Sequence, residues 1–204
     1  MFSRRTTLQA GLAVLIAATA LPALAQTPVV RVRGTIAALD GATLIVITRE
    51  GPTVKITLPD TLEPVALKRV ALDAVKPNSF IGAVATPAAD GTLQASYVLI
   101  FPEAMRGTGE GHYDWDLAPG TTMTNATVTS FVQANAGHKL SLVYKGTPID
   151  LSVPTDAPIL TFTTASRADL KPGAKVLVNA NKVSDGVYNG LRVTVGKDGV
   201  NPPQ

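Results

Sequence analysis

The sequence predicts an all-β protein: two tandem small antiparallel β-barrels of the OB or SH3-like kind, joined by an ordered insert, after an N-terminal signal peptide. The main observation is that the stretch 31–101 recurs at 125–195 with almost constant spacing, so that Pro59 matches Pro154 95 positions later. Alternating apolar and polar residues and Asp-Gly turns recur in both stretches. Such self-similarity indicates two copies of one structural unit.

The predicted division of the chain has five parts. They are a signal peptide (1–25), a first β-barrel repeat (29–101), an inter-repeat insert (102–124), a second β-barrel repeat (125–197) and a disordered tail (198–204).

The first 25 residues have the pattern of an export signal. Arg4 and Arg5 precede an apolar run over 10–21, and Ala23-Leu24-Ala25 provides a cleavage site. The paired arginines fit a twin-arginine signal as well as general secretion, so both export routes remain open. We expect a periplasmic or secreted protein that is cleaved near Ala25.

Composition excludes several classes of protein. There is no Cys, hence no disulfide framework and no thiol for a lipid anchor. The net charge is +3, and Arg4 and Arg5 supply two of these charges, so the cleaved chain lacks the basic surface that nucleic-acid binding requires. No second apolar run is long enough to span a membrane, and we therefore expect no integral membrane segment in the mature chain.

Each repeat begins with β-strands joined by tight turns. The β-rich runs 43–48 and 139–144 are followed by Gly51 and Gly146, which predict hairpin turns. The next segments, 54–58 and 149–153, alternate apolar and polar residues with period two, as expected for half-buried strands.

The middle of each repeat predicts a strand and then a turn of helix. The segment 65–75 taken alone fits an amphipathic helix, but its counterpart 160–170 contains Thr161-Phe162-Thr163-Thr164, which favours a strand. We therefore predict a short strand and one helical turn in both, ending before Lys76-Pro77 and Lys171-Pro172 because proline stops a helix.

Two further strands complete each repeat. The segments 80–85 and 175–181 lead into Asp-Gly pairs, which are strong signals for a hairpin. The last strands follow at 93–101 and 187–195.

The order of these elements resembles a family of uncharacterised bacterial secreted domains with an OB-like barrel, described only as a domain of unknown function. The matching motifs are Ala74-Val75-Lys76-Pro77-Asn78 with Asp90-Gly91, and Asp169-Leu170-Lys171-Pro172-Gly173 with Asp185-Gly186. The first motif has Asn78 where glycine is usual, although Asn also tolerates a left-handed backbone. The resemblance implies a fold and an exported location, and no activity.

The insert concentrates the residues that can carry chemistry. It contains the only Trp of the chain, Trp115, one of the two His residues, His112, and the carboxylates Glu110, Asp114 and Asp116. In an extended backbone the acidic and imidazole groups point one way, and Tyr113 and Trp115 point the other. The candidate ligand-binding residues are Glu110, His112, Asp114, Trp115 and Asp116. Three of them, His112, Glu110 and Asp114, are the candidate ligands of a divalent metal.

Two hypotheses remain open for the insert. In the first, Tyr113 and Trp115 fill the gap between the barrels and the charges face solvent. In the second, the polar groups bind a divalent metal or a cationic organic ligand, although one His with scattered carboxylates does not match a known zinc-ligand spacing.

We expect a non-enzymatic exported protein of two OB-like repeats that acts as a binding or scaffolding module. No catalytic residues are assigned, and its partner is expected to be an envelope protein or a small ligand. The alternative is a metal-assisted hydrolase or a metal-binding protein that uses the insert.

Overall fold

The computed structural model describes residues 29–134 and 137–204, so the predicted signal peptide lies outside the described residues. The described part is all-β, with thirteen strands, three single-turn 3-10 helices and no α-helix. The strands are β1 (Val29–Asp40), β2 (Thr43–Thr48), β3 (Thr53–Thr57), β4 (Val65–Arg69), β5 (Phe80–Pro87), β6 (Leu93–Ile100), β7 (Gly111–Asp114), β8 (Thr122–Ala134), β9 (Gly137–Tyr144), β10 (Thr147–Val153), β11 (Ile159–Thr164), β12 (Lys175–Ser184) and β13 (Val187–Val195).

Local predictions for the middle of each half are confirmed. The 3-10 helices η1 (Leu72–Ala74) and η3 (Arg167–Asp169) follow β4 and β11 and end before the Lys-Pro pairs. A third, η2 (Glu103–Met105), begins the insert. The left-handed backbone expected after each Lys-Pro pair is also present, with φ of 69° at Asn78 and 88° at Gly173.

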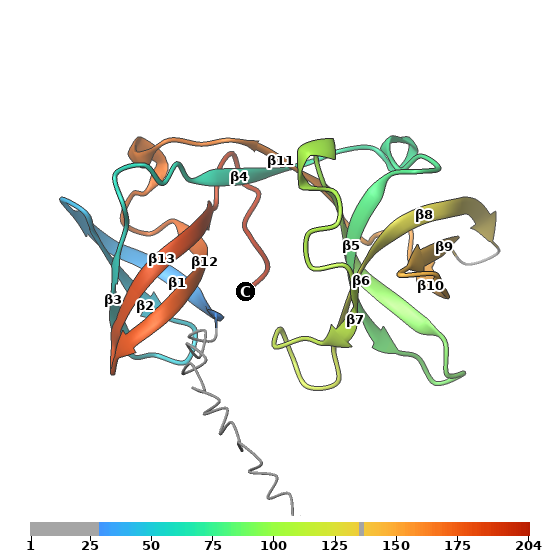
Figure 1. Cartoon of the computed structure of the whole chain (residues 1–204), viewed down its shortest axis with the longest axis horizontal. Helices are drawn as coiled ribbons and strands as arrows, with labels where there is room; N and C mark the ends of the chain where they lie inside the picture. Colours follow the sequence, from blue (N-terminus) through green and yellow to red (C-terminus); the bar gives the residue numbers. More distant parts are fainter. Residues whose placement is uncertain (1–28, 135–136) are drawn as a thin grey trace, which may run out of the picture.

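Hydrogen bonding closes two rings of five strands, which lie apart in Figure 1. The first ring runs β1-β2-β3-β13-β12 and back to β1, with β3 and β13 parallel. The second ring runs β8-β9-β10-β6-β5 and back to β8, with β10 and β6 parallel. Each ring encloses its own apolar core, one around Leu44, Ile56 and Val178, the other around Ile81 and Leu142.

The rings differ from the tandem arrangement expected for 29–101 and 125–197. The first ring combines β1, β2 and β3 of the N-terminal half with β12 and β13 of the C-terminal half. The second ring combines β8, β9 and β10 of the C-terminal half with β5 and β6 of the N-terminal half. The exchange happens because β4 and β11 do not turn back onto their own half; they run antiparallel to each other, with Leu67 opposite Phe162. Figure 1 shows this pair bridging the two rings.

The insert belongs structurally to the second ring. Its strand β7 pairs with β8, and β8 already begins at Thr122, three residues before the expected start of the second repeat. Arg106 donates to the backbone oxygen of Asn78 at 2.7 Å, which fixes the start of the insert against the chain that precedes β5.

The segment 198–204, expected to be a disordered tail, instead packs against the body of the protein. Val200 pairs with Lys197 in an isolated β-bridge and packs against the apolar cluster around Tyr97 and Met123, as Trp115 also does. Pro202 is buried. Figure 1 shows the C-terminus in the space between the two rings. Apolar contacts of Val200 and Pro202 account for the ordered position, since burial of such side chains is favourable.

Candidate functional site

The outer face of the first ring carries a row of polar side chains. In the register of its three adjacent strands, Arg31 of β1 lies opposite Asn179 of β12, which lies opposite Arg192 of β13. The neighbouring positions Val32 and Val178 point into the core. Because side chains alternate along a strand, the row Arg31, Asn179 and Arg192 points outward on one face.

The corresponding outer face of the second ring is apolar. There Met123 of β8 lies opposite Val84 of β5, which lies opposite Tyr97 of β6. These three side chains are buried and form a cluster with Leu67 and Leu160. Tyr97 and Arg192, like Val84 and Asn179, are 95 positions apart in the sequence and occupy matching places in the strand pairings.

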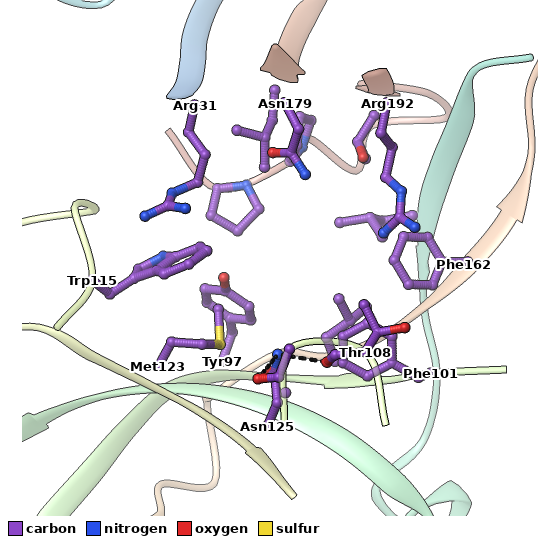
Figure 2. A pocket seen from close by; sticks show the side chains of 18 of the residues that line it. Arg31, Tyr97, Phe101, Thr108, Trp115, Met123, Asn125, Phe162, Asn179 and Arg192 are labelled. Atoms are coloured by element: carbon purple, nitrogen blue, oxygen red, sulfur yellow. Dashed lines mark hydrogen bonds between the residues drawn. The ribbon is translucent and has the colours of Figure 1, made fainter. Parts of the chain in front are cut away.

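The two outer faces enclose a cavity of about 230 Å³. Figure 2 shows Arg31, Asn179 and Arg192 on one side of the cavity, Tyr97, Phe101 and Asn125 on the other, and Trp115 and Phe162 at its two ends. Its lining residues come from both rings, the β4-β11 bridge, the insert and the tail: Val29, Arg31, Leu67, Gly82, Tyr97, Leu99, Phe101, Thr108, Gly109, Tyr113, Trp115, Met123, Asn125, Phe162, Leu177, Asn179, Arg192, Thr194, Pro202 and Pro203. The lining contains two arginines and no acidic residue.

Asn125 anchors the insert at the base of this cavity. Its amide nitrogen donates to the backbone oxygens of Thr108 and Gly109, at 3.1 and 3.3 Å, and lies 3.2 Å from the hydroxyl of Tyr113. Its amide oxygen fits beside Gly82, where a Cβ would approach it to 2.7 Å. A glycine at position 82 is therefore required for Asn125 to hold the loop in this position.

Trp115 closes one end of the cavity. The guanidinium carbon of Arg31 lies 4.0 Å from the centroid of the Trp115 ring, a cation-π contact between the first ring and the insert. The ring of Tyr113 is tilted against that of Trp115, with their centroids 6.2 Å apart. Tyr113 and Trp115 thus occupy the gap between the rings, as the first hypothesis for the insert expects.

Asp116 connects the insert to the first ring. Its carboxylate accepts hydrogen bonds from Arg31 at 3.0 Å and from the buried Arg33 at 2.8 Å. Arg49 donates to the backbone oxygens of Asp116 and Leu117 at 2.8 and 2.9 Å. Burial acts to raise the pKa of Asp116, but the hydrogen bonds from Arg33 and Arg31 outweigh it, so the pKa lies below its usual value.

Several polar groups of the cavity lining have no polar partner within the described ranges, among them the indole N–H of Trp115 and two groups on facing sides, Arg192 and the Tyr97 hydroxyl. Arg192 makes no hydrogen bond or salt bridge there, and neither does the hydroxyl of Tyr97, which points into the cavity in Figure 2. Burial raises the pKa of Tyr97, against a smaller opposing effect of Arg33. The phenol is therefore a neutral hydrogen-bond donor at physiological pH.

The structure gives two of the predicted metal ligands, Glu110 and His112, partners within the protein. His112 Nδ1 lies 2.8 Å from the hydroxyl of Thr124, and its ring stacks on Tyr144. Glu110 accepts a hydrogen bond from the backbone N–H of Lys145 at 2.8 Å, and Asp114 is exposed. Within 29–134 and 137–204, no group of three or more His, Asp or Glu side chains is arranged to hold a metal ion.

The candidate ligand-binding residues thus divide into two groups. Trp115 lines the cavity and Asp116 supports its wall through Arg31, whereas Glu110, His112 and Asp114 do not line it. Sequence reasoning missed the cavity residues Arg31, Tyr97, Asn179 and Arg192. One signal was present: Tyr97 and Arg192 are matched positions of the two halves that differ in chemistry.

No protein-family model, curated protein or solved structure matches the chain. In the part of the chain that is described, no helix is long and apolar enough to cross a membrane.

Proposed function

We propose that the protein is an exported, non-enzymatic binding protein that holds a small ligand in the cavity between its two rings. One observation carries the proposal. Two matched outer faces meet at this cavity, and one is apolar while the other presents Arg31, Asn179 and Arg192. A contact that served only to join the rings would be more stable with apolar residues on both faces, because burying charged groups is costly.

We also propose that each ring is a small OB-like barrel and that the two halves arose by internal duplication. The closed circuit of five strands, the 3-10 turn that follows β4 in one half and β11 in the other, and the antiparallel pairing of β4 with β11 support this interpretation. OB-like barrels commonly bind ligands on an outer face or in their loops. The export signal in residues 1–25 supports a periplasmic or secreted location.

The cavity chemistry supports binding more than catalysis. General acid-base catalysis uses groups that titrate near neutral pH, such as a histidine or a perturbed carboxylate. The titratable residues in the lining are arginines and tyrosines. The metal-assisted alternative requires Glu110, His112 and Asp114 to converge, and each has a different environment.

A thermal-shift screen tests the proposal. The panel contains organic anions, amines, neutral aromatics, divalent metals and cell-wall fragments. A ligand at about 100 times its dissociation constant should stabilise the protein by about 2.7 kcal/mol and raise the melting temperature by several degrees. Its binding should also change the fluorescence of Trp115, the only tryptophan of the chain and part of the cavity lining.

Two phenylalanine variants locate the binding site. Leu177→Phe adds volume inside the cavity and should abolish the shift, whereas Val183→Phe, at an exposed position, should preserve it. The proposal is wrong if no compound gives a shift that Leu177→Phe removes, or if the pure protein hydrolyses its ligand.

A further inference from the structure

We infer that the cavity binds a planar organic anion, with a carboxylate facing the Arg31-Asn179-Arg192 row and an aromatic or conjugated body against the rings on the opposite side. The inference rests on the proposed binding function and specifies its ligand class. It is carried by the cavity residues themselves, taken one side at a time.

The first ring supplies an excess of positive charge. Arg31 and the buried Arg33 share a single carboxylate, that of Asp116, and Arg192 has no acidic partner in the described ranges. Asn179 stands between Arg31 and Arg192 and provides an amide donor. A guanidinium presents paired N–H groups that match the two oxygens of a carboxylate, so Arg192 is suited to bind one.

The second ring adds a neutral donor on the facing side. The Tyr97 side chain is almost fully buried, at 9% exposure, and its hydroxyl points into the cavity. The hydroxyl is accessible from the cavity, and an anionic oxygen placed there would accept its hydrogen bond. The phenol and the arginine row thus face the same space from opposite sides.

Aromatic rings define the shape of the remaining volume. Phe101, Tyr113, Trp115 and Phe162 line the cavity together with aliphatic side chains, and Phe101 and Phe162 pack against each other with centroids 5.8 Å apart. Flat faces of this kind favour a planar molecule through offset or edge-to-face stacking. The volume of about 230 Å³ is below the range of about 300–1,000 Å³ that is common for drug-sized ligands, so the anion is small.

An organic cation fits the site less well. Aromatic cages attract cations, but the face of Trp115 is already occupied by the guanidinium of Arg31 at 4.0 Å. A second cation would also meet Arg192, and the lining contains no carboxylate to compensate the charge.

The test compares acids with their uncharged amides. Isothermal titration calorimetry measures the binding of benzoate against benzamide and of cinnamate against cinnamamide, because each pair differs in charge and hardly in shape. We expect at least one of the two carboxylates to bind at least about tenfold more tightly than its amide, as charge-assisted hydrogen bonds are stronger than neutral ones.

Three variants assign this preference to the cavity. Arg192→Gln should weaken carboxylate binding about tenfold or more and leave amide binding unchanged, and Tyr97→Phe should weaken it several-fold by removing one donor. Lys55→Gln removes one positive charge from an exposed position of β3 outside the cavity and should bind as the wild type does. Melting curves of each variant establish that it is folded.

Each outcome decides the inference. Equal affinity for acid and amide, equal binding by Arg192→Gln and Lys55→Gln, or no binding of either carboxylate would overturn the anion assignment. The binding function would still stand if the wider panel contained another ligand whose effect Leu177→Phe removes. If the panel contained none, both proposals would fail.

Discussion

Asp116 is the residue through which the insert holds the first ring. Arg33, whose side chain is only 2% exposed, has this carboxylate as its salt-bridge partner in the described ranges. The same group holds Arg31, and Arg31 covers the face of Trp115. Removing one partner of a buried ion pair costs more than the pair contributes, because the other charge stays buried.

Asp116→Asn should therefore lower the free energy of unfolding. The expected loss is about 1–2 kcal/mol, moderated by solvent because the Asp116 side chain is nearly half exposed. Denaturant unfolding measures it. Asp114→Asn is the matched control, since Asp114 is an exposed carboxylate two residues away and its replacement should change stability by less than about 0.5 kcal/mol.

The Asp116→Asn effect should also depend on pH. A carboxyl whose folded pKa lies below its unfolded value, near 4, stabilises the protein above that value and loses this contribution as pH falls through the folded pKa. The difference in stability between wild type and Asp116→Asn should be constant from about pH 5 to 7 and shrink below about pH 4. A difference that persisted unchanged at pH 2 would contradict the assigned ion pair.

At the scale of elements, the C-terminal segment 198–204 packs against the body of the protein beside the cavity. Pro202 and Pro203 line the same cavity as Trp115, and Val200 and Trp115 pack against the same apolar cluster. Gln204 donates to the backbone oxygen of Val176 on β12 at 3.4 Å, a long contact that adds little. The segment thus covers part of the cavity from the side of the first ring.

Truncation after Lys197 should expose Trp115 to solvent. We expect a shift of its emission to longer wavelength and stronger quenching by acrylamide, together with a loss of about 1–3 kcal/mol of stability from the buried Val and Pro side chains. Asp198→Asn, without truncation, is the control because Asp198 is exposed and asparagine tolerates its positive φ of 50°. Unchanged quenching in the truncated protein would show that the segment does not cover Trp115 in solution.

For the whole molecule, the exchange of strands between halves has a direct consequence. Each apolar core requires residues of both halves: Leu44 and Val178 in the first ring, Ile81 and Leu142 in the second. The bridge of β4 and β11 joins the halves through five paired positions. Neither half in its observed conformation encloses a core.

Fragments 29–101 and 102–204 test this arrangement. Each fragment alone should be unfolded or should pair with a second copy of itself, whereas the two mixed together should form a folded 1:1 complex, because only the mixture restores both cores. Size-exclusion chromatography and circular dichroism measure the outcome. A folded monomer of 29–101 would show that the repeat closes on itself and that the exchange is not required.

Several features of the fold follow from short stretches of sequence. Period-two alternation at 54–58 and 149–153 predicts strands because it reports which side chains meet a core. Asp-Gly pairs predict the hairpins because glycine adopts positive φ, observed as 81° at Gly91 and 72° at Gly186. The Lys-Pro pairs end the 3-10 turns because proline restricts the residue before it.

The candidate site could be predicted only in part. Trp115 and Asp116 were found because unusual residues cluster in the insert. Arg31, Asn179 and Arg192 were missed because they come from three distant strands, and each is an ordinary residue in its own segment. The predicted metal ligands Glu110 and His112 are close in sequence, but in the fold Glu110 accepts the backbone N–H of Lys145 and His112 lies against the Thr124 hydroxyl.

By itself the sequence determined the strands, their turns and the existence of two similar halves, because these depend on local backbone preference and on the alternation of apolar residues. The tertiary structure alone decided which half supplies which strand to each ring and what lies between the rings. Apolar residues alternate in the same way in the stretches 54–58 and 149–153, so the alternation does not distinguish pairing within a half from pairing between halves. The path of β4 and β11 chooses between the two pairings, and with that choice it brings the arginine row and the aromatic rings to one cavity.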